Sequence, residues 1–444
     1  MRILVDNGEY GLVNKGDLAI IQVTVSRLRE LWPNAEIGLV TEAPAKVGMY
    51  FPGVTPVPYS GPGGWPEPGM PLRIAERAPG LLRAGLDAGQ ATTTRARNAA
   101  RPLKRAIRAP HDPLDAEPEV PQIDYRPAPG AVREADLVVC AGGGYMTDAH
   151  AGGVSRTLSI LSAAVDAGIP TAMFGQGIGP LERSELASRA KEVLPRLELI
   201  ALREGVRSPA LLGELGVPAE RVVVTGDDAI GLAVALRSYA AGPDLGINLR
   251  LAEYTDVKRE QVVDVSAAVQ AAANARVAYL SPIYVSEWQD EDRLGTLEIA
   301  GDYPLIRPDH SRHAPPSEVI ERVGQCRVLV TSTYHAAVFA LSQGIPTICL
   351  PRSQYYIGTF EGLANQFPTG CKLVPLDTHG LRDSLTRGIH AMWDQAPDLR
   401  STLRDAAAGQ VAASRTAYRR LREALDNDRL AQSTGERSPI SAAS

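Results

Sequence analysis

The stretch that decides the fold is Arg327–Pro351, RVLVTSTYHAAVFALSQGIPTICLP. Its first apolar run, VLV, predicts a buried parallel strand, and residues 335–342 have the apolar spacing of a helix that Gly344 would end. A second buried strand is expected at 345–350. The strand-to-helix corner of this α/β unit carries His335. Because ligands bind at the carboxyl ends of parallel strands, we predict a functional role for His335 rather than a simple turn hydrogen bond.

Length and composition predict a two-domain protein of the ordinary globular class. The chain has 444 residues, of which 44% are hydrophobic and 22% are charged, and a single core rarely grows to this size. The formal net charge of −5 argues against a dedicated nucleic-acid binder. The sequence contains no apolar run as long as a bilayer span and no signal-peptide pattern. We therefore expect a cytoplasmic protein with reduced cysteines.

The alternation of strand and helix begins at the N-terminus. A strand at 2–5 leads into a loop rich in Gly and Asn, and a helix opens at Gly16 and Asp17 and ends near Leu31. Asp17 is well placed as the helix N-cap, and its carboxylate could also serve a ligand. A strand, a glycine-rich loop and a helix in this order are typical of a phosphate- or nucleotide-binding start, although the spacing is not GxGxxG.

Four further strands, between residues 137 and 224, end in residues that suit ligand binding. The segments after these strand ends are Gly142–Gly144, Gly175–Pro180, Arg203 with Ser208, and Gly226–Asp228. Glycines allow a backbone to approach a ligand closely and to present its N–H groups. Because the carboxyl ends of parallel strands lie along one edge of a sheet, the series predicts the rim of a ligand cleft.

The order of the predicted elements also indicates the domain organisation. We expect an N-terminal Rossmann-like domain over 1–236 that contains a Pro-rich insertion at 44–129, and a second Rossmann-like domain over 244–395. A helix at 399–426 would pack back across both domains, and a disordered tail would occupy 428–444.

Two polar segments are further candidates, one for membrane binding and one for metal binding. Between Arg73 and Arg108 there are nine Lys and Arg residues against two acids, which suits either an anionic membrane surface or a solvated insertion, and we favour the insertion. Asp309, His310 and His313 have the spacing of metal ligands, but no ordered elements are predicted around them. We therefore predict no metal site.

Taken together, these motifs resemble the polysaccharide pyruvyl transferase family. The matching segments are Asn14–Ile20, Gly142–Gly144, Gly175–Pro180, Leu202–Glu204 with Ser208, and Tyr334–Ala336. The resemblance implies an α/β fold of two Rossmann-like domains facing a cleft, like that of the GT-B glycosyltransferases. It also implies transfer of pyruvate from phosphoenolpyruvate (PEP) onto two hydroxyls of a sugar, which forms a ketal. The acceptor would be a cell-envelope polysaccharide or a glycolipid, and no cofactor would be needed.

The resemblance also assigns roles to residues. His335 would protonate the enol carbon or assist phosphate departure, Arg203 would grip the carboxylate or phosphate, and Asp17 would take a proton from the acceptor or position it. Further substrate-binding residues are expected at the strand ends and helix starts. They are Asn14, Gly16, Gly142, Gly143, Gly144, Gln176, Gly177, Gly179, Ser208, Ser332, Thr333 and Arg352.

The chain departs from the family pattern at two positions. Thr333 stands where the family usually has an arginine, and Thr359 where it often has a lysine. Arg352 is the nearby residue that could compensate for these cations. The departures leave two alternatives open: a GT-B-like glycosyltransferase that uses a nucleotide sugar, or a non-catalytic member that binds an anionic sugar or a partner. Peripheral contact with the inner membrane surface is a further expectation.

Overall fold

The computed structural model describes residues 1–60, 128–238, 240, 242–251, 257–274, 276–286, 289–306 and 313–434. Most of the insertion expected at 44–129, with its basic stretch, lies outside the described residues, as do Asp309 and His310.

The first half of the chain builds an eight-stranded sheet in which every pairing is parallel. Its strand order is β3-β2-β1-β4-β6-β7-β8, and β5 pairs with β6 off this path. The elements are β1 (Arg2–Asp6), α1 (Lys15–Leu31), β2 (Glu36–Thr41), α2 (Pro44–Tyr50), β3 (Thr55–Pro58), α5 (Ala128–Glu134), β4 (Leu137–Cys140), β5 (Gly143–Met146), α6 (Ala151–Asp166), β6 (Thr171–Ile178), α7 (Ser184–Val193), β7 (Leu199–Leu202), α8 (Ser208–Glu214), β8 (Val222–Val224) and α9 (Ala229–Ala235).

The second half builds a five-stranded parallel sheet of order β10-β9-β11-β12-β13. Its elements are β9 (Asp244–Asn248), α10 (Arg259–Asn274), β10 (Leu280–Pro282), α11 (Gln289–Ala300), α12 (Pro316–Gly324), β11 (Cys326–Thr331), α13 (Tyr334–Gln343), β12 (Thr347–Cys349), α14 (Gln354–Gln366) and β13 (Cys371–Leu373). The unit predicted from Arg327–Pro351 is β11, α13 and β12. Gly344 ends α13 in a left-handed conformation (φ 87°), which a residue without Cβ adopts at little cost.

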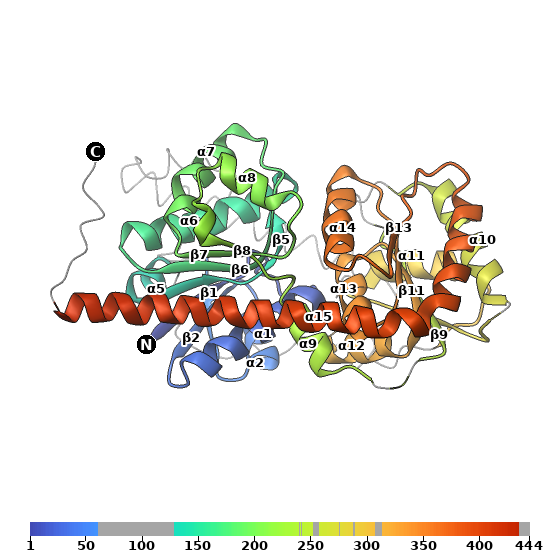
Figure 1. The fold of residues 1–444 in the computed structure, drawn as a ribbon, viewed down its shortest axis with the longest axis horizontal. Coiled ribbons are helices and arrows are strands. Elements are labelled where there is room, and N and C mark those ends of the chain that lie inside the picture. The colour runs from blue at the N-terminus through green and yellow to red at the C-terminus, as the bar shows by residue number, and fades with distance from the viewer. Residues whose placement is uncertain are drawn as a thin grey trace, which may run out of the picture.

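The two sheets form two α/β bodies that lie side by side (Figure 1). Helices α1, α9, α12 and α13 pack against one another where the bodies meet. The largest cluster of buried apolar side chains runs through both bodies, from Ile3 and Leu39 on one side to Val319 and Phe339 on the other. Burial of this continuous apolar surface fixes the strand ends of the two sheets relative to each other.

The last helix, α15 (Leu381–Thr434), crosses both bodies (Figure 1). Leu385 packs in the apolar core of the second sheet, and Tyr418 stacks on Phe174 of the first sheet with ring centroids 3.7 Å apart. The prediction that a terminal helix packs back across the domains at 399–426 therefore had the wrong start, because the helix already begins at Leu381 and continues through Pro397. The disordered tail predicted from residue 428 is also corrected, because the helix extends to Thr434.

The start of the predicted insertion needs a further correction. Residues 44–58 are not part of an appendage, since α2 and β3 belong to the first body. Strand β3 pairs with β2 in parallel register, with Val57 opposite Val40. Val47 is buried in the large apolar cluster and Val57 in a smaller one with Leu4 and Val40, so both elements are packed into the first body. No helix of the described residues is long and apolar enough to cross a membrane.

Candidate active site

A cleft of about 600 Å³ opens between the two bodies. Its first wall is formed by the loop before α1, by β5 and the start of α6, and by Arg203. Its second wall is formed by Arg250, Ser286, the start of α13 and residues of α14. The cleft thus lies at the carboxyl ends of both parallel sheets, where ligands of open α/β folds bind. Of the predicted residues, the cleft is lined by Asn14, Asp17, Gly144, Arg203, Thr333 and His335.

His335 lies in the first turn of α13 and is buried, with its ring against Gly16 of α1. The N-cap of α1 is Asn14 and not Asp17 as predicted. The Asn14 side chain accepts the Gly16 N–H at 2.8 Å. Asp17 instead lies in the first turn, free of the capping role, and its side chain reaches the cleft.

Asp227, from the corner after β8, faces His335. Its Oδ2 atom lies 3.7 Å from Nε2 of His335 and 3.9 Å from Nη1 of Arg203. Both distances suit ion pairs but exceed a hydrogen bond. Burial raises the pKa of Asp227, but His335, Arg203 and the Ala229 N–H oppose burial and bring the pKa below its usual value. Asp227 is therefore ionised at neutral pH.

Asp17 has the opposite environment. Burial raises the pKa of Asp17 well above its usual value, and the carboxylates of Glu9 and Asp227 raise it further, while Arg203 opposes them only in part. The pKa of Asp17, which lines the cleft, and the pKa of Asp227, which contacts the cleft residues His335 and Arg203, are thus shifted in opposite directions. Such a difference is the usual sign of separate acid–base roles.

Arg203 is the buried cation at the centre of the cleft. It follows β7, and its Cζ lies 4.3 Å from the ring centroid of Tyr334. Burial lowers the pKa of Arg203, but Tyr334, Tyr355 and Asp227 raise it above the usual value, so the guanidinium stays charged. Two predicted glycines make room for it, because a Cβ on Gly177 would lie 2.5 Å from Nε and one on Gly144 would lie 2.8 Å from Nη2.

Other predicted residues support the wall from behind. Gln176 donates to the Ala141 carbonyl and to the Tyr145 hydroxyl, both at 2.8 Å, and Ser208 Oγ accepts the Ile178 N–H at 3.0 Å. A Cβ on Gly142 would lie 2.5 Å from the Gly175 carbonyl oxygen. The structure does not bring Gly142, Gly143, Gln176, Gly177, Gly179 or Ser208 to the lining of the cleft.

Two predicted residues of the second body also lie elsewhere. Ser332 Oγ accepts the backbone N–H of Arg250 at 2.8 Å. Arg352 pairs with Asp377 at 3.8 Å, and the described residues that line the cleft do not include it. The structure therefore does not place Arg352 where it could replace the cations expected at 333 and 359.

Three residues at or beside the cleft were not predicted as site residues from the sequence. Asp227 belongs to the Gly226–Asp228 corner, whose place after a strand was the available signal. Arg250 stands just beyond β9, at a strand end of the second sheet, and the same rule would have found it. The sequence offered no such signal for Tyr355 of α14, whose hydroxyl donates to the Gly144 carbonyl at 2.9 Å and joins the two walls.

Several solved structures have a similar fold. A putative UDP-N-acetylglucosamine 2-epimerase from Listeria monocytogenes is 12% identical, with a TM-score of 0.56 and 97% of each chain covered. S. aureus MnaA with UDP is also 12% identical, with a TM-score of 0.56, over 96% of this chain and 97% of that one. Anabaena Alr3699/HepE with UDP is 12% identical, with a TM-score of 0.52, over 96% and 99%. These likenesses show the fold, which is GT-B-like as predicted.

No curated protein matches the chain in sequence. The family model of polysaccharide pyruvyl transferases, in contrast, matches residues 14–354. This range begins at the N-cap of α1, includes Arg203, Arg250 and His335 of the cleft, and ends at the first residue of α14. The chain therefore belongs to the polysaccharide pyruvyl transferase family, a family of transferases.

Proposed function

We propose that the protein transfers pyruvate from PEP to two hydroxyls of a sugar and releases phosphate. The observation that carries the proposal is the contact between His335, which lines the cleft, and the buried Asp227, which faces it. Nε2 of His335 and Oδ2 of Asp227 are buried and have no hydrogen-bond partner among the described residues. Buried polar atoms usually have partners, so this pair suits a site that a polar ligand completes.

The reaction requires a proton donor for carbon and an acceptor of protons from oxygen. Protonation of C3 of PEP turns its methylene into a methyl group and makes C2 electrophilic. One sugar hydroxyl then adds to C2 and loses its proton. The C2–O bond to phosphate breaks, the phosphate departs with the bonding electron pair, and the second hydroxyl closes the ketal as it loses its proton.

The residues of the cleft suit these steps. In the proposal the imidazolium of His335 protonates C3, and the ionised Asp227 stabilises that imidazolium, as a carboxylate beside a catalytic histidine does. Asp17 accepts the proton of the attacking hydroxyl, because a carboxylate of raised pKa is a stronger base. Arg203 offsets the negative charge of the donor.

The test is a reaction of the full-length protein with PEP and a panel of envelope sugars and lipid-linked sugars. We expect phosphate release that depends on both substrates and a product that carries a ketal methyl signal in NMR. A protein that binds a UDP-sugar and not PEP would contradict the proposal and support the glycosyltransferase alternative. Binding of PEP without turnover on any acceptor would support a non-catalytic role.

The acceptor in this proposal is a sugar of a cell-envelope polysaccharide or glycolipid. A cytoplasmic location and peripheral contact with the inner membrane surface belong to the same proposal, and both rest on the sequence alone.

A further inference from the structure

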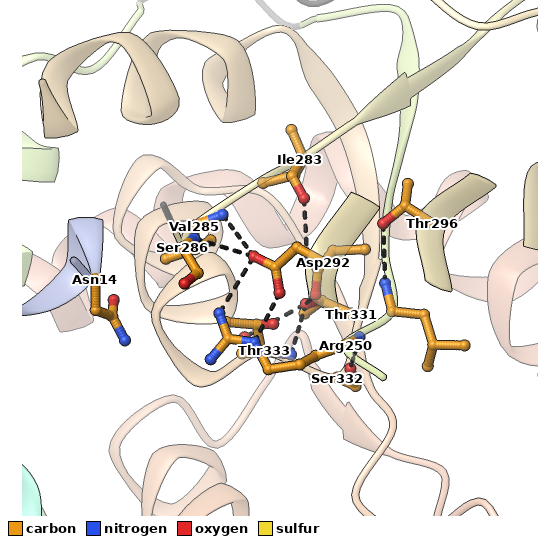
Figure 2. Close-up of polar contacts among 12 residues, drawn as sticks. Asn14, Arg250, Ile283, Val285, Ser286, Asp292, Thr296, Thr331, Ser332 and Thr333 are labelled. Atoms are coloured by element: carbon orange, nitrogen blue, oxygen red, sulfur yellow. Dashed lines mark hydrogen bonds and ion pairs between the residues drawn. The ribbon is translucent and has the colours of Figure 1, made fainter. Parts of the chain in front are cut away.

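The guanidinium of Arg250 is held in a fixed direction at the wall of the cleft. Its side chain is 8% exposed, and its Nε and Nη2 atoms donate to the two carboxylate oxygens of Asp292 at 2.7 and 3.2 Å. The Arg250 backbone N–H donates to Ser332 Oγ at 2.8 Å. Figure 2 shows this group beside Thr333. Arg250 is therefore positioned next to the start of α13 before any ligand binds.

Asp292 also binds the loop of the second body that contacts the first body. Its Oδ2 atom accepts the backbone N–H groups of Val285 and Ser286 at 2.8 and 3.1 Å (Figure 2). The Val285 carbonyl in turn accepts the Lys15 N–H at 2.7 Å, and Ser286 forms a β-bridge with Asn14. One carboxylate therefore sets both the direction of Arg250 and the contact with the first turn of α1.

The start of α13 is suited to an anion, and the helix contains no lysine or arginine. Thr333 is its N-cap residue, is 4% exposed and lines the cleft. Its hydroxyl makes no capping hydrogen bond and has no partner among the described residues. A helix N-terminus and a hydroxyl donor together favour an oxyanion, and a guanidinium beside them adds the missing charge.

We infer that Arg250, oriented by Asp292, binds the phosphate group of the donor at the N-terminus of α13, together with the Thr333 hydroxyl. Arginine presents five N–H donors in a planar fork, so one guanidinium can bind a carboxylate and a phosphate at the same time. The inference rests on the proposed function for the identity of the donor, PEP. It makes Arg250 a binding residue and Asp292 the residue that positions it.

The position of Arg352 supports this assignment over the one suggested by the sequence. Arg352 pairs with Asp377, which is 57% exposed, and it does not lie among the described residues that line the cleft. Arg250 follows a different strand, β9, and its backbone N–H donates to Ser332, the residue before Thr333.

Calorimetry of the full-length protein with PEP and with inorganic phosphate tests the inference. Arg250→Ala should raise both Kd values about 10- to 100-fold, the scale of a lost charged hydrogen-bonding group. Millimolar methylguanidinium should restore part of the affinity, which a merely structural defect would not show. Arg250→Lys should give an intermediate Kd because it keeps the charge and loses the planar fork.

Controls separate this effect from a loss of fold. Arg250→Ala leaves Asp292 buried without its ion-pair partner, so the double variant Arg250→Ala, Asp292→Asn checks thermal unfolding without the buried charge. Arg276→Ala is the matched control, because Arg276 pairs with Asp394 at 3.0 Å in the second body and does not line the cleft. It should change Kd by less than about twofold.

Several outcomes would overturn the inference. They are unchanged binding in Arg250→Ala, an equal loss in Arg276→Ala, a loss in Arg352→Ala instead, or a full-length protein that binds neither PEP nor phosphate. If the full-length protein binds both ligands through Arg250 but forms no ketal, the proposed function fails while the phosphate subsite stands.

Discussion

The imidazole ring of His335 occupies the space in which a side chain on Gly16 would stand. A Cβ atom at Gly16 would lie 1.9 Å from Cγ of His335 and 2.0 Å from Nδ1. The two residues belong to different bodies, so the histidine can take its place only because the second residue of the helix that faces it is a glycine. Real Cβ atoms do not approach this closely, and any substitution must move the ring or separate the helices.

Gly16→Ala should therefore lower kcat/KM by about 10²-fold or more, because a displacement of about 1 Å at a reacting group has effects of that size. Steady-state kinetics of phosphate release measures it. Gly48→Ala is the matched control, since Gly48 lies in α2 and a Cβ atom there would have no neighbouring atom within 4 Å. That variant should keep full activity and gain about 0.5–1 kcal/mol of stability. Equal activity in both variants would contradict the positioning of His335 by Gly16.

His335→Asn should lower kcat by about 10²–10⁴-fold with little change in KM, because a proton donor acts in the transition state. Asp227→Asn should lower kcat as well, since it removes the charge 3.7 Å from Nε2. The double variant should be scarcely slower than His335→Asn alone, because residues that act as a unit have non-additive effects. Additive losses would show that Asp227 acts independently of His335.

The activity should rise with pH through the raised pKa of Asp17. Only its ionised form accepts a proton from the acceptor hydroxyl, and burial together with Glu9 and Asp227 keeps it protonated to a higher pH than an ordinary aspartate. A pH profile of kcat/KM measures this limb. Asp17→Asn should lower the activity and remove the limb. A limb that persists in the variant would assign the titration to another group.

Asp228 should make the protein less stable as the pH rises from about 4 to about 6. Burial raises the pKa of Asp228 from 3.8 to about 6, although Ser414 and Tyr418 of α15 donate to it and oppose the shift. Within this window the folded state binds more protons than the unfolded state, so stability falls with increasing pH, by at most about 3 kcal/mol, and is level above it.

Urea unfolding of the full-length protein and of Asp228→Asn at several pH values checks this sign. The amide oxygen of asparagine can accept from one of the hydroxyls of Ser414 and Tyr418, its NH2 group can donate to the other, and the amide does not titrate. The difference between the two proteins should therefore grow from pH 4 to pH 6 in favour of the variant. A difference that is constant with pH would show that Asp228 keeps an ordinary pKa in the folded protein.

The sequence by itself determined the α/β class and the place of His335. Apolar runs followed by helical spacing, with glycines and capping residues between them, are local signals, and local signals specify strands, helices and the corners between them. For the same reason, His335 and Arg203 could be assigned to strand ends from the sequence. The four strands predicted between residues 137 and 224 begin where β4 begins, at Leu137, and end where β8 ends, at Val224.

Only the tertiary structure decided which of these corners share a site. Asp227 faces His335, and Arg250 lines the same cleft as His335, because the shared core holds the two bodies with their strand ends facing each other. No local pattern encodes that packing. Arg352, three residues beyond β12, pairs with Asp377 instead. The length of α15 has the same cause. Its residues pack in the apolar clusters of both bodies between Leu381 and Leu425, on both sides of Pro397, because tertiary burial outweighs a local helix-breaking residue.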